Sequence, residues 1–203
     1  DRKHRQVVPE DGAAQPYDKL ILSIGASARR LRLPGCELSG VHYLRTIDDV
    51  LAIREYVRKG RRMVIVGGGY IGLEVAAVTA TLGMDVTVVE MQDRVMKRVV
   101  SPQISKIYEE VHRAHGVELR LNAGIDRFLG EKHVVGVKLA DGKEIAADVV
   151  VVGIGIQPNV GLAAEAGLEV SDGIVVDDHC LTSDQDIFAV GDCTFHPNAL
   201  LGR

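Results

Sequence analysis

Short apolar runs and helically spaced apolar residues alternate along the middle of the chain, and glycine marks most of the boundaries between them. The runs at residues 63–66, 86–89 and 117–121 predict strands buried on both faces, because a half-exposed strand would alternate apolar and polar residues. The stretches 70–82 and 101–115 recur at helical spacing. This order predicts a β-α-β-α-β unit with a parallel sheet.

The flanking sequence predicts shorter elements. These are strands within residues 1–25, an irregular stretch over 26–45, a helix over 46–59, an antiparallel meander over 128–148 with a hairpin turn at 140–143, strands at 149–152, 173–177 and 187–190, and a short helix at 163–167. The pattern therefore predicts an α/β fold in which an antiparallel meander follows the parallel sheet.

The stretch 101–115 has the strongest helix signals. Ser101 followed by Pro102 is typical of a helix start. An apolar stripe is expected at Ile104, Ile107, Tyr108 and Val111. His112 and His115 lie three residues apart on this helix, but no third ligand has a suitable spacing, so we expect them to be exposed polar positions and predict no metal site.

One motif carries specific chemistry. Gly67-Gly68-Gly69-Tyr70-Ile71-Gly72 is a G-x-G-x-x-G sequence that follows a predicted strand and opens a predicted helix. Gly67 permits the tight turn, Gly69 lets a pyrophosphate approach the backbone, and Gly72 lets the helix pack closely on the strand. The first helical residues, Tyr70 and Ile71, present N–H groups and a positive dipole end to the phosphates. This context predicts a Rossmann-type dinucleotide site.

An acidic residue closes the next predicted strand. Glu90 lies 18 residues after Gly72, close to the spacing of about 20 at which such a residue binds the adenosine ribose. Its carboxylate accepts hydrogen bonds from ribose hydroxyls and repels a 2′-phosphate, which favours NAD over NADP. Arg94, Lys97 and Arg98 are close in sequence, and one of them offers a compensating charge.

The bulk composition excludes several classes. The net charge is −4 and hydrophobic residues make up 46% of the chain, so it lacks the basic footprint of a nucleic-acid-binding protein. No apolar run approaches the roughly 18 residues of a membrane span. The cysteines Cys36, Cys180 and Cys193 are far apart, which predicts unpaired thiols in a cytoplasmic protein.

Three stretches resemble a known family. They are residues 64–74 (VIVGGGYIGLE), 90–108 (EMQDRVMKRVVSPQISKIY) and 182–193 (TSDQDIFAVGDC). They are similar to the FAD-dependent pyridine nucleotide-disulfide oxidoreductases, and within them to the ferredoxin, rubredoxin and putidaredoxin reductases. The similarity spans almost the whole chain.

The resemblance implies a domain organisation. Residues 1–46 would end the first segment of an FAD-binding domain, residues 47–165 would form an inserted NAD-binding domain, and residues 166–203 would begin the second FAD segment. The amino-terminal FAD fingerprint and the carboxy-terminal domain of the family are not found, so we expect a piece of a longer polypeptide.

The resemblance also implies further cofactor-binding residues. Gly191 and Asp192 match a strand-end pair whose aspartate binds FAD. Arg29 stands where the family has an FAD-contacting arginine, after a turn that reads Ser23-Ile24-Gly25 here and lacks the family's threonine. Glu74 and Gly155 match positions near the nicotinamide of NAD.

The function implied is that of a flavoprotein oxidoreductase carrying electrons from NADH through FAD to a ferredoxin- or rubredoxin-type iron–sulfur protein. Hydride transfer between these cofactors requires no side-chain acid, base or nucleophile, so no catalytic residue is predicted. Two alternatives stay open: an NADH-dependent nitrite or disulfide reductase of the same architecture, and a non-enzymatic NADH-sensing module. Neither the electron acceptor nor the oligomeric state follows from the sequence.

Overall fold

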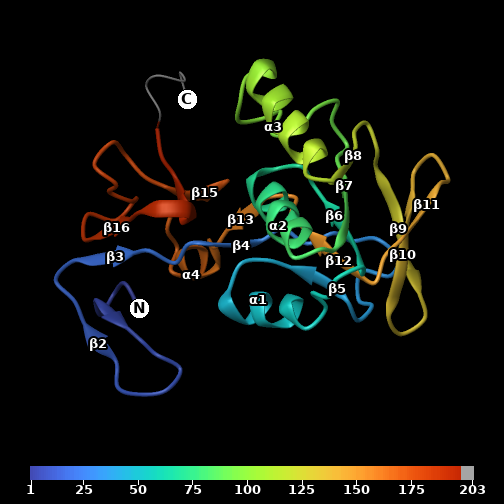
Figure 1. Cartoon of the computed structure of the whole chain (residues 1–203). Coiled ribbons are helices and arrows are strands. Elements are labelled where there is room, and N and C mark those ends of the chain that lie inside the picture. Colours follow the sequence, from blue (N-terminus) through green and yellow to red (C-terminus); the bar gives the residue numbers. More distant parts are fainter. Residues whose placement is uncertain (198–203) are drawn as a thin grey trace. The chain divides into compact units, whose positions relative to one another are not determined.

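The computed structural model describes residues 1–197, which form two compact units (Figure 1). The first unit contains Asp1–Ser27 and the chain from Ile156 onward, and the second contains Ala28–Gly155. The chain passes between them at the short paired strands β4 (Ala26–Ala28) and β13 (Ile156–Pro158). Each unit has its own hydrophobic core.

A five-stranded parallel sheet organises the second unit. Its order is β5-β12-β6-β7-β8, with bounds β5 (Val41–Tyr43), β12 (Val149–Val152), β6 (Arg62–Val66), β7 (Asp85–Val89) and β8 (Glu118–Arg120). All four residues of β12 are buried, as are four of the five in β6. This burial explains why the central strands are continuous apolar runs without polar alternation.

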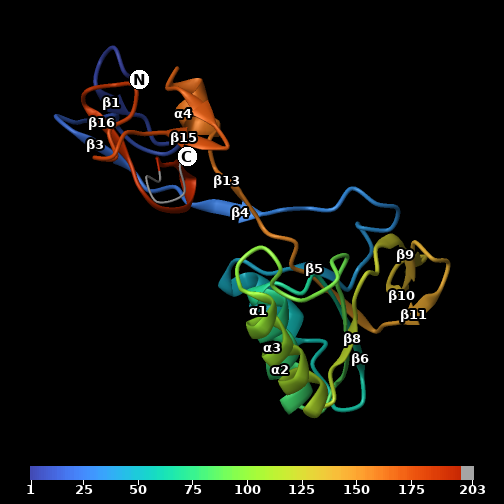
Figure 2. The same cartoon turned by 90° about the horizontal axis from the view of Figure 1, so that it is seen from above.

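Alternate residues of the central strands enter two different cores. Met63 and Ile65 pack with the helices α1 (Ile47–Arg54) and α2 (Tyr70–Thr81), while Val64 and Val66 pack with the antiparallel meander. The meander consists of β9 (Ile125–Gly130), β10 (Val134–Leu139) and β11 (Glu144–Ala146). Figure 2 shows α1, α2 and α3 (Pro102–Ala114) on one face of the sheet and the meander on the other. The expected α/β fold with parallel sheet and meander is confirmed.

The first unit is built from shorter elements. A parallel pair, β3 (Leu20–Leu22) and β16 (Ile187–Ala189), packs with a three-stranded sheet of order β14-β15-β17. The remaining bounds are β14 (Val170–Ser171), β15 (Gly173–Val175), β17 (Thr194–Phe195), β1 (Gln6–Val7), β2 (Gln15–Pro16), α4 (Gly161–Glu165) and a 3-10 turn at Gly191–Cys193. Leu22, Ile174, Ile187 and Cys193 are at the centre of its core.

Two predictions were wrong, one of secondary structure and one of side-chain burial. The stretch 26–45, expected to be irregular, contains β5 at the edge of the sheet, because Val41–Tyr43 gain their hydrogen bonds by pairing with β12. His112, expected to be exposed, is only 8% exposed. Its ring nitrogens lie 2.8 Å from the carbonyl oxygen of Tyr108 and 3.1 Å from that of Leu73.

The predicted apolar stripe of α3 is exposed and does not face the core of the unit. Ile107 is 54% exposed and Val111 is 50% exposed, whereas Ser105 is fully buried. The inward face of α3 is therefore polar, and backbone groups satisfy its polar atoms. Among the described residues, no helix is long and apolar enough to cross a membrane.

Candidate functional site

The strand order of the second unit creates a place for a ligand. The chain runs from β6 to β7 and β8 on one side, while β12 pairs with β6 on the other side. The order therefore reverses direction at β6, and ligands of open α/β sheets bind beyond the carboxyl ends of the strands at such a point. The glycine motif begins immediately after β6 and so occupies this position.

The first and last glycines of the motif, Gly67 and Gly72, lie too close to backbone carbonyl oxygens to carry a side chain. Gly67 has φ +109°, and a Cβ there would lie 2.3 Å from the carbonyl oxygen of Gly153. A Cβ on Gly72 would lie 2.1 Å from the carbonyl oxygen of Gly67. Side chains are thus excluded at both positions by neighbouring backbone, and the start of α2 is held tightly against the turn after β6.

The third glycine of the motif differs from these two. Gly69 is the N-cap of α2, and a Cβ there would meet no atom within 4 Å. The backbone therefore faces open space where the helix begins. Tyr70 and Ile71 follow it, 51% and 36% exposed. The first four N–H groups of a helix lack intrahelical partners, so this end of α2 offers donors and a positive dipole end to an anion.

The carboxylate of Glu90 is fixed next to the motif. One oxygen accepts a hydrogen bond from the N–H of Gly68 at 2.7 Å, and the other accepts one from the N–H of Gln92 at 2.8 Å. A carboxylate has about four acceptor positions, so both oxygens can accept further bonds. An open helix start beside a fixed acceptor fits the pyrophosphate and ribose of a dinucleotide.

Two of the three basic residues after Glu90, Arg94 and Lys97, contact nearby residues of the same segment. Arg94 donates to the carbonyl oxygens of Val100 and Lys97 at 2.9 and 3.0 Å. Lys97 pairs with Asp93 at 3.2 Å. Arg94 therefore cannot compensate a 2′-phosphate without breaking these contacts, whereas the Lys97–Asp93 pair is exposed and weak.

Three further predicted residues belong to the second unit. Glu74 is exposed on α2, two positions beyond Gly72. Gly155 is exposed, has φ +106°, and follows β12. Its carbonyl oxygen accepts a hydrogen bond from the N–H of Arg29 at 3.0 Å. The structure thus places Arg29 beside Gly155, next to the strand that neighbours β6.

The predicted pair Gly191 and Asp192 belongs to the first unit. They form a 3-10 turn just after β16, where Gly191 has φ +80° and Asp192 is exposed. Sequence reasoning missed Asn159, whose side chain donates to the carbonyl oxygen of Ile24 at 2.8 Å and whose N–H donates to that of Gly25 at 3.0 Å. Asn159 therefore supports the glycine turn after β3, the parallel neighbour of β16.

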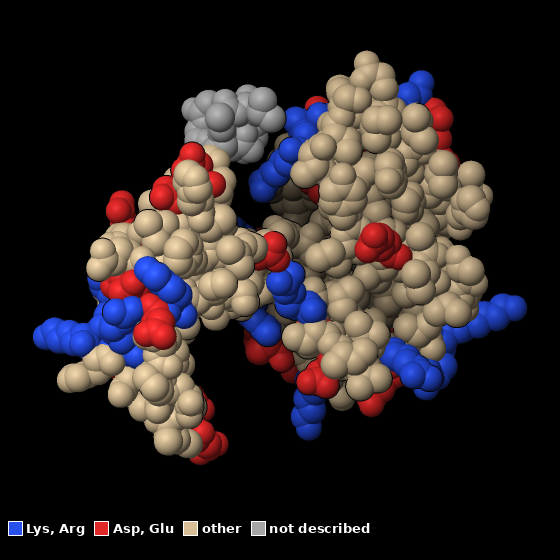
Figure 3. Space-filling view, turned by 90° about the vertical axis from the view of Figure 1, so that its left-hand side faces the viewer, with Lys and Arg blue, Asp and Glu red and all other residues tan. Residues whose placement is uncertain are grey.

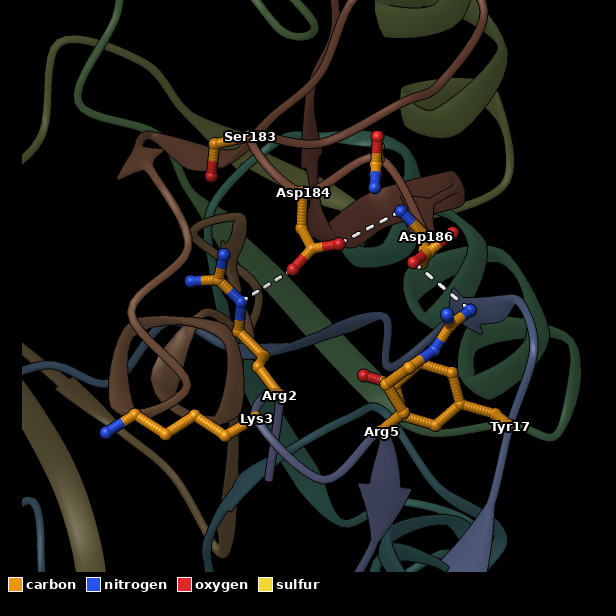
Figure 4. A pocket seen from close by; sticks show the side chains of 8 residues that line it. Arg2, Lys3, Arg5, Tyr17, Ser183, Asp184 and Asp186 are labelled. Carbon is orange, nitrogen blue, oxygen red and sulfur yellow. Dashed lines mark hydrogen bonds and ion pairs between the residues drawn. The ribbon is translucent and has the colours of Figure 1, made fainter.

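An open depression of about 480 Å³ also lies in the first unit (Figure 4). Arg2 pairs there with Asp184 at 2.8 Å, and Arg5 pairs with Asp186 at 3.1 Å. Acidic and basic side chains are interspersed on the face shown in Figure 3. The depression contains none of the predicted cofactor-binding residues, and both of its carboxylates are already paired with arginines.

Several known proteins are similar to this chain in sequence. The profile of the pyridine nucleotide-disulphide oxidoreductase family matches residues 1–201. A rubredoxin-NAD(+) reductase of Ectopseudomonas oleovorans is 47% identical over 197 residues, covering 97% of this chain and 51% of the relative. The ferredoxin reductase subunit of a 5,5'-dehydrodivanillate O-demethylase of Sphingobium sp. is 46% identical, covering 92% of this chain and 46% of the relative.

Solved structures agree with these relatives. The reductase in a covalent putidaredoxin reductase–putidaredoxin complex matches with a TM-score of 0.94 and 40% identity, covering 100% of this chain and 50% of that chain. The ferredoxin reductase of the CYP199A2 system of Rhodopseudomonas palustris matches with a TM-score of 0.96 and 40% identity, with the same coverage. This chain spans about half the length of the relatives it matches. From its sequence and its fold, the chain belongs to the pyridine nucleotide-disulphide oxidoreductase family.

Proposed function

We propose that this chain is part of an NADH-dependent flavoprotein reductase that passes electrons through FAD to a ferredoxin- or rubredoxin-type iron–sulfur protein. The observation that carries the proposal is the glycine motif at the end of β6, with the carboxylate of Glu90 fixed on the N–H of Gly68 at 2.7 Å. The names of the relatives support the electron acceptor, since they include rubredoxin and ferredoxin reductases.

The second unit would bind NAD through its own groups. The N–H groups at Gly69, Tyr70 and Ile71 would hold the pyrophosphate, because the space before the start of α2 is open. Glu90 would accept hydrogen bonds from the adenosine ribose and exclude a 2′-phosphate. Glu74 and Gly155 would lie toward the nicotinamide, as the resemblance implies.

The flavin would be held by other groups. Asp192, exposed in the turn after β16, would bind the FAD chain, with Gly191 giving the backbone its tight turn. Arg29 would add a positive charge. When bound, the two cofactors supply hydride and single-electron chemistry, and the residues of this chain supply position and electrostatics.

The domain assignment is part of the proposal. The resemblance places the NAD-binding domain at residues 47–165, whereas the second compact unit spans Ala28–Gly155. The difference arises because β5 joins the parallel sheet and because α4 packs in the core of the first unit. We assign NAD binding to the second unit from residue 47 onward, and parts of the FAD-binding domain to the first unit and to residues 28–46, which include Arg29.

A cytoplasmic location is also proposed. Its support is the state of the three cysteines, all of which are free: Cys193 is buried, and Cys36 and Cys180 are half-buried. Unpaired thiols of this kind are typical of reducing compartments.

The experiment is an electron-transfer assay on the longer polypeptide that contains this chain together with the rest of its FAD-binding domain, supplied with FAD. We expect a flavin absorbance band that remains after gel filtration, and reduction of ferricyanide that is faster with NADH than with NADPH. The test variant is Asp192→Asn. It removes one carboxylate and should weaken flavin retention while leaving NADH binding unchanged. Retained NADH binding without any flavin would contradict the reductase and favour an NAD-binding module.

A further inference from the structure

The segment between β7 and α3 lies directly against the second glycine of the motif. We call this segment, residues 91–100, the adenosine loop. The N–H of Met96 donates to the carbonyl oxygen of Gly68 at 2.9 Å. Val95 is fully buried, and its Cγ1 would lie 3.2 Å from a Cβ on Gly68. The loop therefore packs on the turn that begins the nucleotide site.

The same loop holds the carboxylate of Glu90. The N–H that fixes one of its oxygens belongs to Gln92 in the loop, and the N–H that fixes the other belongs to Gly68 in the motif. The carboxylate is thus clamped between the two segments. A displacement of the loop would release Glu90 and would also remove the support behind Gly68.

One arginine and one serine fasten the loop. The Nη1 atom of Arg94 donates to the hydroxyl of Ser105 at 2.7 Å and to the carbonyl oxygen of Val100 at 2.9 Å. Its Nη2 atom donates to the carbonyl oxygen of Lys97 at 3.0 Å. The hydroxyl of Ser105, which is fully buried on α3, donates to the carbonyl oxygen of Val95 at 2.7 Å.

The backbone of the loop shows why such fastening is needed. Met96 has φ +50°, a left-handed conformation that L side chains other than glycine adopt at a cost. Conformations of this kind persist only where the surrounding contacts fix them. Arg94 and Ser105 provide those contacts on both sides of Met96, and the N–H of Met96 is the donor to Gly68.

We propose that Arg94 and Ser105 are positioning residues for nucleotide binding: they hold the adenosine loop against Gly68 and so set the carboxylate of Glu90 and the start of α2. The inference rests on the proposed NAD function of the second unit. It also gives Arg94 a role other than charge recognition, since its guanidinium is occupied by a hydroxyl and two carbonyl oxygens.

The test compares Ser105→Ala with Thr79→Val in the whole chain. Both changes remove a buried hydroxyl that donates to a backbone carbonyl at 2.7 Å, but the hydroxyl of Thr79 bonds to Val75 within α2 and that of Ser105 bonds to the loop. We expect Ser105→Ala to raise the Kd for NADH about tenfold, which corresponds to about 1.4 kcal/mol. Thr79→Val should leave this Kd within about twofold at a comparable loss of thermal stability.

Two further readouts separate positioning from general stability. Trypsin cleavage after Lys97 and Arg98, both exposed in the loop, should be about tenfold faster in Ser105→Ala than in Thr79→Val. Arg94→Lys should show an intermediate Kd, because a lysine retains donors and charge but cannot form the planar fork. Saturating NADH should slow the cleavage in the parent chain.

The possible results separate the positioning role of Arg94 and Ser105 from the proposed NAD binding of the second unit. A parent that binds NADH while Ser105→Ala binds equally well would overturn the positioning role alone. Equal losses of affinity in Ser105→Ala and Thr79→Val would also overturn it, because they would reflect stability only. A parent chain that binds no NADH would contradict the proposed function and, with it, this inference.

Discussion

Substituting alanine at two glycines of the motif, Gly72 and Gly69, is expected to have different effects: the first should reduce stability and the second should reduce nucleotide affinity. Gly72→Ala places a Cβ 2.1 Å from the carbonyl oxygen of Gly67, whereas Gly69→Ala places one where no atom lies within 4 Å. The first change should therefore damage the fold. The second should leave the fold intact and fill the space into which the pyrophosphate would approach.

The magnitudes follow from these contacts. Forcing backbone atoms apart at Gly72 resembles overpacking of a core, which costs about 1–3 kcal/mol. At Gly69 the backbone is extended, with φ −83° and ψ −174°, which alanine adopts without strain. The weaker N-cap costs about 0.5 kcal/mol, and the lower entropy of the unfolded chain offsets about the same amount. The net change in the free energy of unfolding should be near zero.

The assay combines urea unfolding with calorimetric titration of NADH. We expect Gly69→Ala to unfold as the parent does but to bind NADH about 30-fold more weakly, which is about 2 kcal/mol. Gly72→Ala should lose stability in the range given above. Parent-like affinity in Gly69→Ala would refute the assignment of the space before α2 to the pyrophosphate. Equal destabilisation by both changes would refute the steric argument.

Two further predictions concern stability away from the nucleotide. Hydrogen bonds from Arg62 lower the pKa of Asp148 from 3.8 to about 2, so the pair stabilises the fold above pH 3.8 and its contribution is lost as the pH falls from about 4 to 2. Because the pair is partly exposed, Asp148→Asn should lower the free energy of unfolding by about 1 kcal/mol at pH 7. The loss should be clearly smaller at pH 2, where about half of the Asp148 carboxyl groups are protonated. Urea titration at both pH values measures it, and an equal loss at both would contradict this. His112→Ala should cost about 2 kcal/mol in thermal unfolding, because it removes a buried ring and the hydrogen bond that the ring donates to a backbone carbonyl oxygen. The exposed His115→Ala should cost less than about 0.5 kcal/mol, and equal costs would contradict the burial of His112.

The parallel sheet was predictable because its central strands are buried on both faces. The four consecutive valines at 149–152 carry no polar side chain that would need solvent, and the structure buries all four. The glycine motif was predictable for a related reason, since close approaches at Gly67 and Gly72 leave only glycine possible. The constraint at Gly72 comes from Gly67 within the motif, so the local sequence contains it, whereas the constraint at Gly67 comes from the distant Gly153.

The orientation of α3 could not be predicted from its apolar spacing. Periodicity identifies a stripe but assumes that the stripe faces inward. Here Ser105 and His112 face inward, and their polar atoms are satisfied by the carbonyl oxygens of Val95 and Leu73. These partners lie 10 and 39 residues away in sequence, so the pattern of α3 alone does not contain them.

The same limit applies to the site. The sequence indicated Glu90 by its spacing, but not the bond of its carboxylate to Gly68, 22 residues earlier. Nor did it indicate that Arg94 is fastened to Ser105, so that Arg94 had seemed available to a 2′-phosphate. Asn159 bonds to Ile24 across 135 residues, and no pattern near Asn159 in the sequence indicates this partner.

The most direct measurement is equilibrium binding of NADH and NADPH to the purified chain, repeated with Glu90→Ala. Asp85→Asn is the matched control, because it removes a carboxylate from the opposite end of the same strand, β7. The account predicts that the parent and Asp85→Asn bind NADH at least tenfold more tightly than NADPH, and that Glu90→Ala narrows this gap. Equal binding of both nucleotides by the parent, or an unchanged preference in Glu90→Ala, would contradict it.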